Sequence, residues 1–455
     1  MRATWSRGLH LHPGQWTAAC TAVSLIALFA MAGPLRPEGK AALALGAGLS
    51  LLLLPGGMSF ALIPLGGLAL LTPQPLPAVH LFDVCAIVLT VLAMFWTLRA
   101  TDRRAWDLHG PGLFALAFVL TPLPALPFAV VNRISFLGMY KGYVLLACLF
   151  LSLRRLVPRA RSRVLLWVFP IVGTAGALQL LWKTRGLGAL LFARLNFRNF
   201  YSGLGWGQSD YISAVIECCL CGTIVLLMLE RRAVVRVALV GALLIMAQAF
   251  LLLFSRAGAL SLLVFAGILA LSWKRERVVL AGVAIATILA GALATSGGQV
   301  FMRRFVDPGE YGSWYFRLLT WEAGIGRFLE HPWTGFGLNQ GRYVSDVIGH
   351  ESANSSILDF MGEQGILGGV LFVAIVVAAI RLAMRADPAE PSAQSSLRGA
   401  LLGMVAAVVL HSLVEPTLTG HVLSVLFIYL LAYLTLLDPR GQHDLISPQV
   451  RAINR

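Results

Sequence analysis

A polar stretch, GHESANSSILDFMGEQGILGG, lies at residues 349–369 of a chain that is otherwise mostly apolar. His350 and Asn354 are one helical turn apart, and so are Asp359 and Glu363, so in a helix each pair would lie on one face. An imidazole or a carboxylate can transfer protons, so this stretch contains the groups that acid–base chemistry needs. The simpler interpretation is the capped start of a membrane helix, because serine and asparagine favour helix N-termini.

Arginines are the second group of residues that could do chemistry. Arg194 and Arg198 are four residues apart and, in a helix, could hold one diphosphate between two guanidinium groups. Arg256 interrupts a long apolar stretch, where an ionisable side chain is costly unless it faces a cavity or a partner. Arg317 lies in an amphipathic segment, 313–329, that fits a helix along the membrane surface. Each arginine also has a simpler interpretation, as a residue whose charge reaches head groups or water.

Composition defines the class of protein in which these residues lie. Of the 455 residues, 58% are hydrophobic and 13% are charged. Repeated apolar runs of about 17 to 22 residues match the length that crosses the ~30 Å hydrocarbon core of a bilayer as an α-helix. The sequence therefore predicts an all-α, polytopic integral membrane protein. Its six cysteines lie in apolar runs without a companion histidine, and we interpret them as small apolar residues.

Fourteen apolar runs are candidate membrane spans. We expect 12–14 transmembrane helices, because 41–54 and 58–72 are short for a full span. The candidates are 16–33, 41–54, 58–72, 82–98, 112–131, 135–152, 164–182, 210–229, 235–254, 257–273, 278–296, 365–383, 397–415 and 421–437.

Basic residues in the short connections predict how these spans are oriented. Lysine and arginine are concentrated in the cytoplasmic loops of membrane proteins. The connection 153–163 has five arginines and no acidic residue, and the connections with Arg231 and Lys274 lie on the same side. These loops, and with them both chain termini, are predicted to be cytoplasmic.

Two longer polar stretches then face outward. One is the arginine-rich loop 183–209, and the other is a large outer (periplasmic) loop with interfacial helices, 297–364. They divide the chain into an N-terminal transmembrane bundle at 1–182, central transmembrane helices with the first loop at 183–296, the large loop at 297–364, and C-terminal helices with a cytoplasmic tail at 365–455.

Basic residues are also frequent on the predicted outer side, against the orientation rule. A concentration of this kind suggests that an anion binds there, either lipid head groups or a phosphorylated substrate. These residues are Arg133, Lys183, Arg185, Arg194, Arg198, Arg256, Arg303, Arg304, Arg317, Arg327 and Arg342.

The order of these features resembles the O-antigen ligase and polymerase family of bacterial envelope proteins. The resemblance rests on a Ser-Arg-x-Gly turn at 255–258, an outer loop with an arginine-bearing helix, an HPxxGxG element at 331–337 and then a helix ending in GILGG at 365–369. By motif it covers residues 190–385, and elsewhere it covers the topology alone.

The resemblance implies a GT-C-like membrane glycosyltransferase that works without a metal or another cofactor. Its donor would be a glycan on undecaprenyl diphosphate, and transfer would occur at the periplasmic face of the inner (cytoplasmic) membrane. A ligase would use lipid A-core oligosaccharide as acceptor, and a polymerase would use another lipid-linked repeat; we favour the ligase. A transporter of lipid-linked glycans is the alternative of another class. Membrane lipids are further expected partners, and nucleic acid is not one.

Within such a reaction, the arginines would stabilise the departing diphosphate. The sequence has no Asp-x-Asp pair to hold a divalent metal, so charge-assisted bonds from guanidinium groups would have to replace it. Arg133, Arg194, Arg198 and Arg256 are expected to bind the diphosphate, and Arg317 is expected to act with them in catalysis.

The acceptor hydroxyl needs a base that is active near neutral pH. His350 is the candidate base, because an imidazole titrates in that range. The family usually has a histidine at the position of Asn354, which here could orient the sugar, and His350 lies one helical turn earlier. Asp210, Asp359 and Glu363 are the alternative bases.

Overall fold

The computed structural model describes a large part of the chain, including most of the predicted central and C-terminal spans. The described residues are 83, 86–91, 93–94, 111–128, 133–184, 209–253, 255–272, 311–339, 355–386, 394–415, 417–418 and 421–438. All of their regular structure is helical, which confirms the predicted all-α fold for this part of the chain. Outside the described residues lie both termini, most of 82–98, and the predicted spans 16–33, 41–54, 58–72 and 278–296.

The described helices follow the predicted apolar runs closely. They are α5 (Pro111–Leu120), η3 (Leu123–Phe128), α6 (Arg133–Leu156), η4 (Arg159–Trp167), α7 (Val168–Thr184), α9 (Ser209–Leu229), α10 (Ala233–Leu253), α11 (Arg256–Ser272), α14 (Tyr311–Glu330), α16 (Ser356–Arg385), α17 (Gln394–Val414) and α18 (His421–Leu437).

Six helical segments in the described part are long and apolar enough to cross a membrane. They are Phe136–Leu156, Arg159–Leu181, Tyr211–Leu229, Ala233–Leu253, Ser356–Arg385 and Ser396–Val414. Shorter apolar helices are found at Leu116–Pro127, Arg256–Ser272 and Val422–Leu437. This pattern supports a multi-pass membrane protein.

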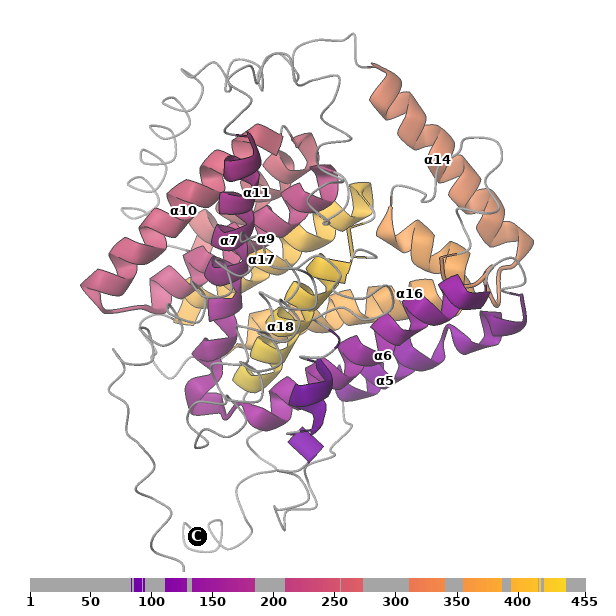
Figure 1. Ribbon diagram of the computed structural model, residues 1–455, viewed down its shortest axis with the longest axis horizontal. Helices are drawn as coiled ribbons and strands as arrows, with labels where there is room; N and C mark the ends of the chain where they lie inside the picture. Colours follow the sequence, from indigo (N-terminus) through magenta and orange to yellow (C-terminus); the bar gives the residue numbers. More distant parts are fainter. Residues whose placement is uncertain are drawn as a thin grey trace, which may run out of the picture.

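Helices α9 and α17 lie in the interior of the described helices (Figure 1). α11 lies along α17 and both contact α9, while α7 and α10 pack against α9, and α16 packs against α17. Small residues allow the close approach of α11 and α17: a Cβ atom at Gly399 would collide with Ser272, and one at Gly403 would lie 3.0 Å from the ring of Phe265. Interfaces between membrane helices generally rely on such residues, because lipid supplies no hydrophobic force to press helices together.

The described part of the polar stretch from Ser356 onward and the apolar run that follows it make up α16, which consists of two helical parts joined at a kink. The kink is at Gly365, whose φ of 67° and ψ of −165° suit a residue without a side chain. Its first part, from Ser356, carries Asp359 and Glu363, and its second part is the apolar span that the sequence predicts at 365–383. The kink interrupts the helix between a polar segment and a membrane segment.

One end of the assembly gathers most of the described candidate residues. α11 begins there with Arg256 and α16 with Ser356, and Glu415 follows the last residue of α17. Arg231 lies in the turn between α9 and α10, and Arg385 is the last residue of α16. Both lie at the other end of the assembly. In the predicted orientation, the end with Arg256 faces outward.

Candidate functional site

Arg317 is fixed by a buried carboxylate. Its Nη2 atom forms an ion pair with Oε1 of Glu415, which is 4% exposed, while the Arg317 side chain is 19% exposed. Because a guanidinium group has five N–H donors, the pair leaves donors of Arg317 for other acceptors. Glu415 thus orients a cation at the end of α17, where an anionic ligand would meet it.

Ser356 connects this ion pair to the start of α16. Its hydroxyl group donates to the backbone oxygen of Glu415 over 3.5 Å and accepts the N–H of Leu418 over 3.1 Å. The first residue of α16, the end of α17 and the connection to α18 therefore meet at one buried side chain. α14 is joined to them through Arg317.

A second buried ionisable pair lies between α9 and α17. Nδ1 of His411 and Oε2 of Glu217 are 2.5 Å apart, and both side chains are at most 1% exposed. Ionisable side chains within membrane helices are rare, and they are commonly functional. Glu415 donates its N–H to the backbone oxygen of His411, so one turn of α17 separates the two acid-containing pairs.

The Glu217–His411 pair lies directly below the Ser-Arg-x-Gly turn. Ser255 accepts the N–H of Gly258 at its Oγ over 3.1 Å, which caps the first turn of α11. A Cβ atom at Gly258 would lie 2.8 Å from the ring of Phe250 and 3.3 Å from Oε2 of Glu217. The serine and the glycine of this motif thus have structural roles, and they hold the half-buried Arg256 above a buried acid.

The HPxxGxG element, residues 331–337, packs directly against the kink of α16. Backbone hydrogen bonds join Phe336 N to Gly362 O (2.9 Å), Gly337 N to Glu363 O (3.0 Å) and Ile366 N to Pro332 O (2.8 Å). These bonds satisfy backbone groups that the kink removes from the helix.

Two glycines make this contact possible. Gly335 and Gly365 have φ values of 68° and 67°, and a Cβ atom on either would collide with backbone atoms of the other segment. The glycines of both motifs are therefore structural, and the contact they permit sets the position of Glu363.

Glu363 takes part in this contact, because its backbone oxygen accepts the N–H of Gly337. Its Oε1 accepts the N–H of Asn339 over 2.9 Å, whereas its Oε2 is buried and has no hydrogen-bond partner among the described residues. Asp359 lies one turn earlier on α16. Arg327 is close enough to interact electrostatically with both acids; burial lowers its pKa, and the two acids oppose that shift.

The other sequence-predicted residues lie partly outside this description. Arg133 begins α6 and Asp210 lies in the first turn of α9, but their side chains are not among those described. Outside the described residues are Arg194, Arg198, His350 and Asn354.

Three residues of the site were missing from the sequence-based prediction: Glu217, His411 and Glu415. The signal for the first two was available, since each is an ionisable residue within an apolar run. Glu415 is the last residue of the predicted span 397–415, and its pairing with Arg317, 98 positions away, has no local signal.

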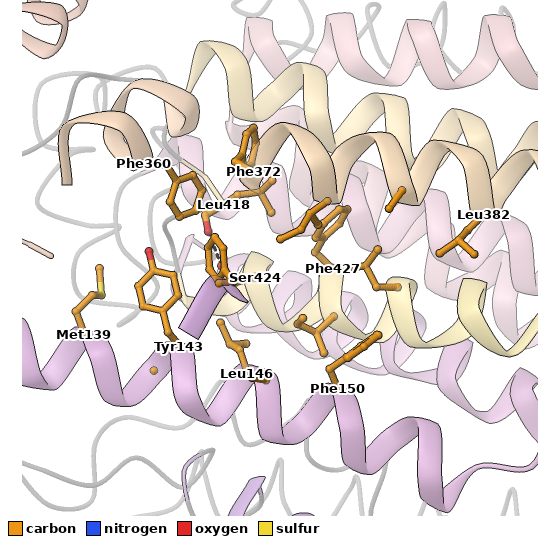
Figure 2. A pocket seen from close by; sticks show the side chains of 17 residues that line it. Met139, Tyr143, Leu146, Phe150, Phe360, Phe372, Leu382, Leu418, Ser424 and Phe427 are labelled. Atoms are coloured by element: carbon orange, nitrogen blue, oxygen red, sulfur yellow. Dashed lines mark hydrogen bonds between the residues drawn. The ribbon is translucent and has the colours of Figure 1, made fainter. Parts of the chain in front are cut away.

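An apolar pocket of about 240 Å³ lies beside the site, between α6, α16 and α18 (Figure 2). Phe360, which is four residues after Ser356, lines it, and so does Leu418, whose N–H donates to Ser356. Tyr143 also lines it and accepts a hydrogen bond of 3.3 Å from Gln364 Nε2. The pocket thus adjoins both the Arg317–Glu415 region and the polar part of α16.

Comparison with known families shows a match over part of the chain. Residues 241–373 match the family described as O-Antigen ligase, a segment that includes Arg256, Arg317, the HPxxGxG element and the kink of α16. Among curated proteins, none matches the chain.

Proposed function

We propose that this chain, a member of the O-antigen ligase/polymerase family of membrane glycosyltransferases, is a ligase. It would transfer a glycan from undecaprenyl diphosphate to lipid A-core oligosaccharide at the periplasmic face of the inner membrane. The observation that carries this proposal is the placement of Arg317 by Glu415 at the start of α16, inside the segment that matches the family.

The arginines would act on the leaving group. As the bond between the anomeric carbon and the diphosphate oxygen breaks, both electrons stay on that oxygen, and negative charge builds up on the diphosphate. Guanidinium groups that are already oriented stabilise such charge without reorganisation. Arg317 is oriented by Glu415, and Arg256 lies in a capped turn above Glu217, which supports this role for both. Arg133, Arg194 and Arg198 are proposed to complete the diphosphate site.

The acceptor hydroxyl would lose its proton to a base as its oxygen attacks the anomeric carbon. His350 remains the proposed base, with Asn354 orienting the sugar. The buried Oε2 of Glu363, which has no partner in the described part of the chain, supports Glu363 as the first alternative. Asp359 and Asp210 are the others.

Two acceptors and one transport measurement test the proposal. Purified protein in nanodiscs would receive a defined glycan on undecaprenyl diphosphate, with either lipid A-core or a second lipid-linked repeat as acceptor. We expect the mass of lipid A-core to increase by one glycan, with little extension of the lipid-linked repeat. Extension of the repeat alone would identify a polymerase. Movement of the donor across vesicle membranes without any transfer would replace the proposal with a transporter.

A further inference from the structure

The side of α10 carries a row of exposed residues that begins with two arginines. Arg232, Arg236, Val240 and Leu244 follow one another at intervals of four residues, and all four are exposed. The N–H of Arg236 is bonded to the backbone oxygen of Arg232 over 3.0 Å, so the two arginines are one helical turn apart and share a face. We call these four residues the α10 row.

The α10 row faces away from the other described helices. Figure 1 shows α10 at the edge of the assembly. Only 22% of the apolar part of α10 is buried, compared with 83% of the apolar part of α9. In a bilayer, the apolar half of the row would therefore contact lipid hydrocarbon. The arginines lie at the end that the sequence predicts to be cytoplasmic, at the level where lipid head groups begin.

The turn before α10 has an excess of positive charge. Arg231 lies in it, and Arg163 reaches it from η4, since its Nη1 donates to the backbone oxygen of Leu229 over 3.2 Å. Glu230 is the acid of this turn, and its Oε1 already accepts the N–H groups of the two residues that follow it, each over 3.0 Å. An anion beside the turn would be attracted by several guanidinium groups.

The guanidinium groups of Arg232 and Arg236 are available for such an anion. Within the described part of the chain, neither group has a hydrogen bond or an ion pair. A charged side chain on a lipid-facing row costs free energy unless it reaches water or an opposite charge. Guanidinium groups bind phosphate in a bidentate manner, and two of them one turn apart can hold the same phosphate group.

α16 has a similar row at the same end of the assembly, which makes a useful comparison. Val377, Arg381 and Arg385 are exposed at intervals of four residues. These two arginines lie at the C-terminal end of their helix, where the helix dipole stabilises cations, whereas Arg232 and Arg236 lie at the start of α10, where it destabilises them. The α10 pair therefore gains more free energy from a bound anion.

We propose that the α10 row binds an anionic phospholipid, with its phosphate between Arg232 and Arg236 and an acyl chain along Val240 and Leu244. The row has the two parts of such a lipid in the right order, a cationic end for the phosphate and an apolar surface for the chain. Free phosphate would use the first part alone. The inference does not depend on glycan transfer.

Native mass spectrometry of the full-length protein in detergent tests this binding. The probe is dioleoylphosphatidylglycerol, and dioleoylphosphatidylcholine is the comparison, because it has the same acyl chains and no net charge. We expect the first phosphatidylglycerol to bind with the lower Kd. Glycerol 3-phosphate, which has the anionic group without the chains, should not displace it.

Two double variants provide a matched pair. Arg232→Gln with Arg236→Gln should raise Kd for phosphatidylglycerol about 30-fold, the usual effect of removing two basic residues from an anionic head group. Arg381→Gln with Arg385→Gln removes the same charge at the same spacing from α16 and should leave this Kd unchanged. Arg232→Lys with Arg236→Lys keeps the charge and should retain most of the binding. If R232Q/R236Q does not fold, R236Q alone should raise Kd about fivefold.

Photo-crosslinking gives the position of the lipid. Phosphatidylglycerol with a diazirine in one acyl chain should label peptides of α10 in the wild type and lose that labelling in R232Q/R236Q. Equal affinity for phosphatidylcholine, an equal loss of binding in R381Q/R385Q, or labelling of α10 that R232Q/R236Q leaves unchanged would each overturn the proposal. Displacement of the lipid by glycerol 3-phosphate would replace it with a phosphate site. A dimer in the wild type that separates in R232Q/R236Q would replace it with a contact between two copies of the chain.

Discussion

Nδ1 of His411 and Oε2 of Glu217 lie 2.5 Å apart at the interface of α9 and α17, below the first turn of α11. Two of the three helices that meet here lead to the candidate site: α11 begins with Arg256, and α17 ends next to Glu415. The pair is therefore placed to fix the relative positions of the two arginine-bearing regions. Removing one partner and removing both should have different consequences.

Glu217→Leu should destabilise the protein by about 3 to 5 kcal/mol, because it breaks a buried pair and leaves His411 without its acid. The double variant Glu217→Leu with His411→Leu should recover most of that loss, because no ionisable group is left unmatched. Thermal unfolding in detergent measures both effects. If the pair positions Arg256, the double variant will be folded and still transfer glycan poorly. A double variant with full activity would show that the pair is structural only.

Arg317→Ala should lower kcat/KM for transfer by about 100- to 1000-fold, the usual effect of losing one preorganised donor to developing charge. Glu415→Gln should lower it less, because the amide still offers an oxygen to Arg317 but not a negative charge. Arg385→Ala is the control, since Arg385 is exposed at the other end of α16. Equal activity of R317A and R385A, with both proteins folded, would remove Arg317 from the mechanism.

The contact between the HPxxGxG element and α16 predicts a difference between neighbouring glycines. Gly365→Ala should destabilise the protein by about 1 to 3 kcal/mol, because alanine is strained at positive φ and its Cβ atom would collide with Trp333. Gly362 lies in the same helix, and a Cβ atom there would meet nothing within 4 Å. Gly362→Ala should therefore be neutral or stabilising by up to about 1 kcal/mol. Melting temperatures of the two variants provide the comparison. A G365A protein as stable as G362A would contradict the packing described here.

Local features of the sequence predicted much of this fold. Apolar runs gave the spans that became α6, α10 and α17, because a membrane helix is defined by its own length and composition. The turn at Arg256 was also visible, since serine and glycine flank a charge between two apolar runs. Motif resemblance identified the family that the match to residues 241–373 supports.

Contacts between distant segments could not be predicted in the same way. Glu217 and His411 are 194 positions apart, and nothing local to either residue specifies the other. Gly335 and Gly365 belong to the motifs that resemble the family, but their contact depends on a break in the helix between a polar segment and a membrane span. The structure thus gives those glycines a physical role: they allow the backbone contact that positions Glu363.

The choice of base can be tested by three substitutions that remove the basic group, and by their pH profiles. His350→Gln should lower kcat by about 100-fold or more, the usual contribution of a general base, with less effect on donor binding. In the wild type, kcat should fall as pH decreases, because a base that is already protonated cannot accept the acceptor's proton. An ordinary imidazole becomes protonated near pH ~6.5. H350Q should lack this acidic limb. Glu363→Gln keeps an oxygen for the N–H of Asn339 and therefore tests the charge of Glu363 apart from its structural bond. If H350Q is fully active while E363Q or Asp359→Asn is inactive and folded, a carboxylate on the first part of α16 is the base.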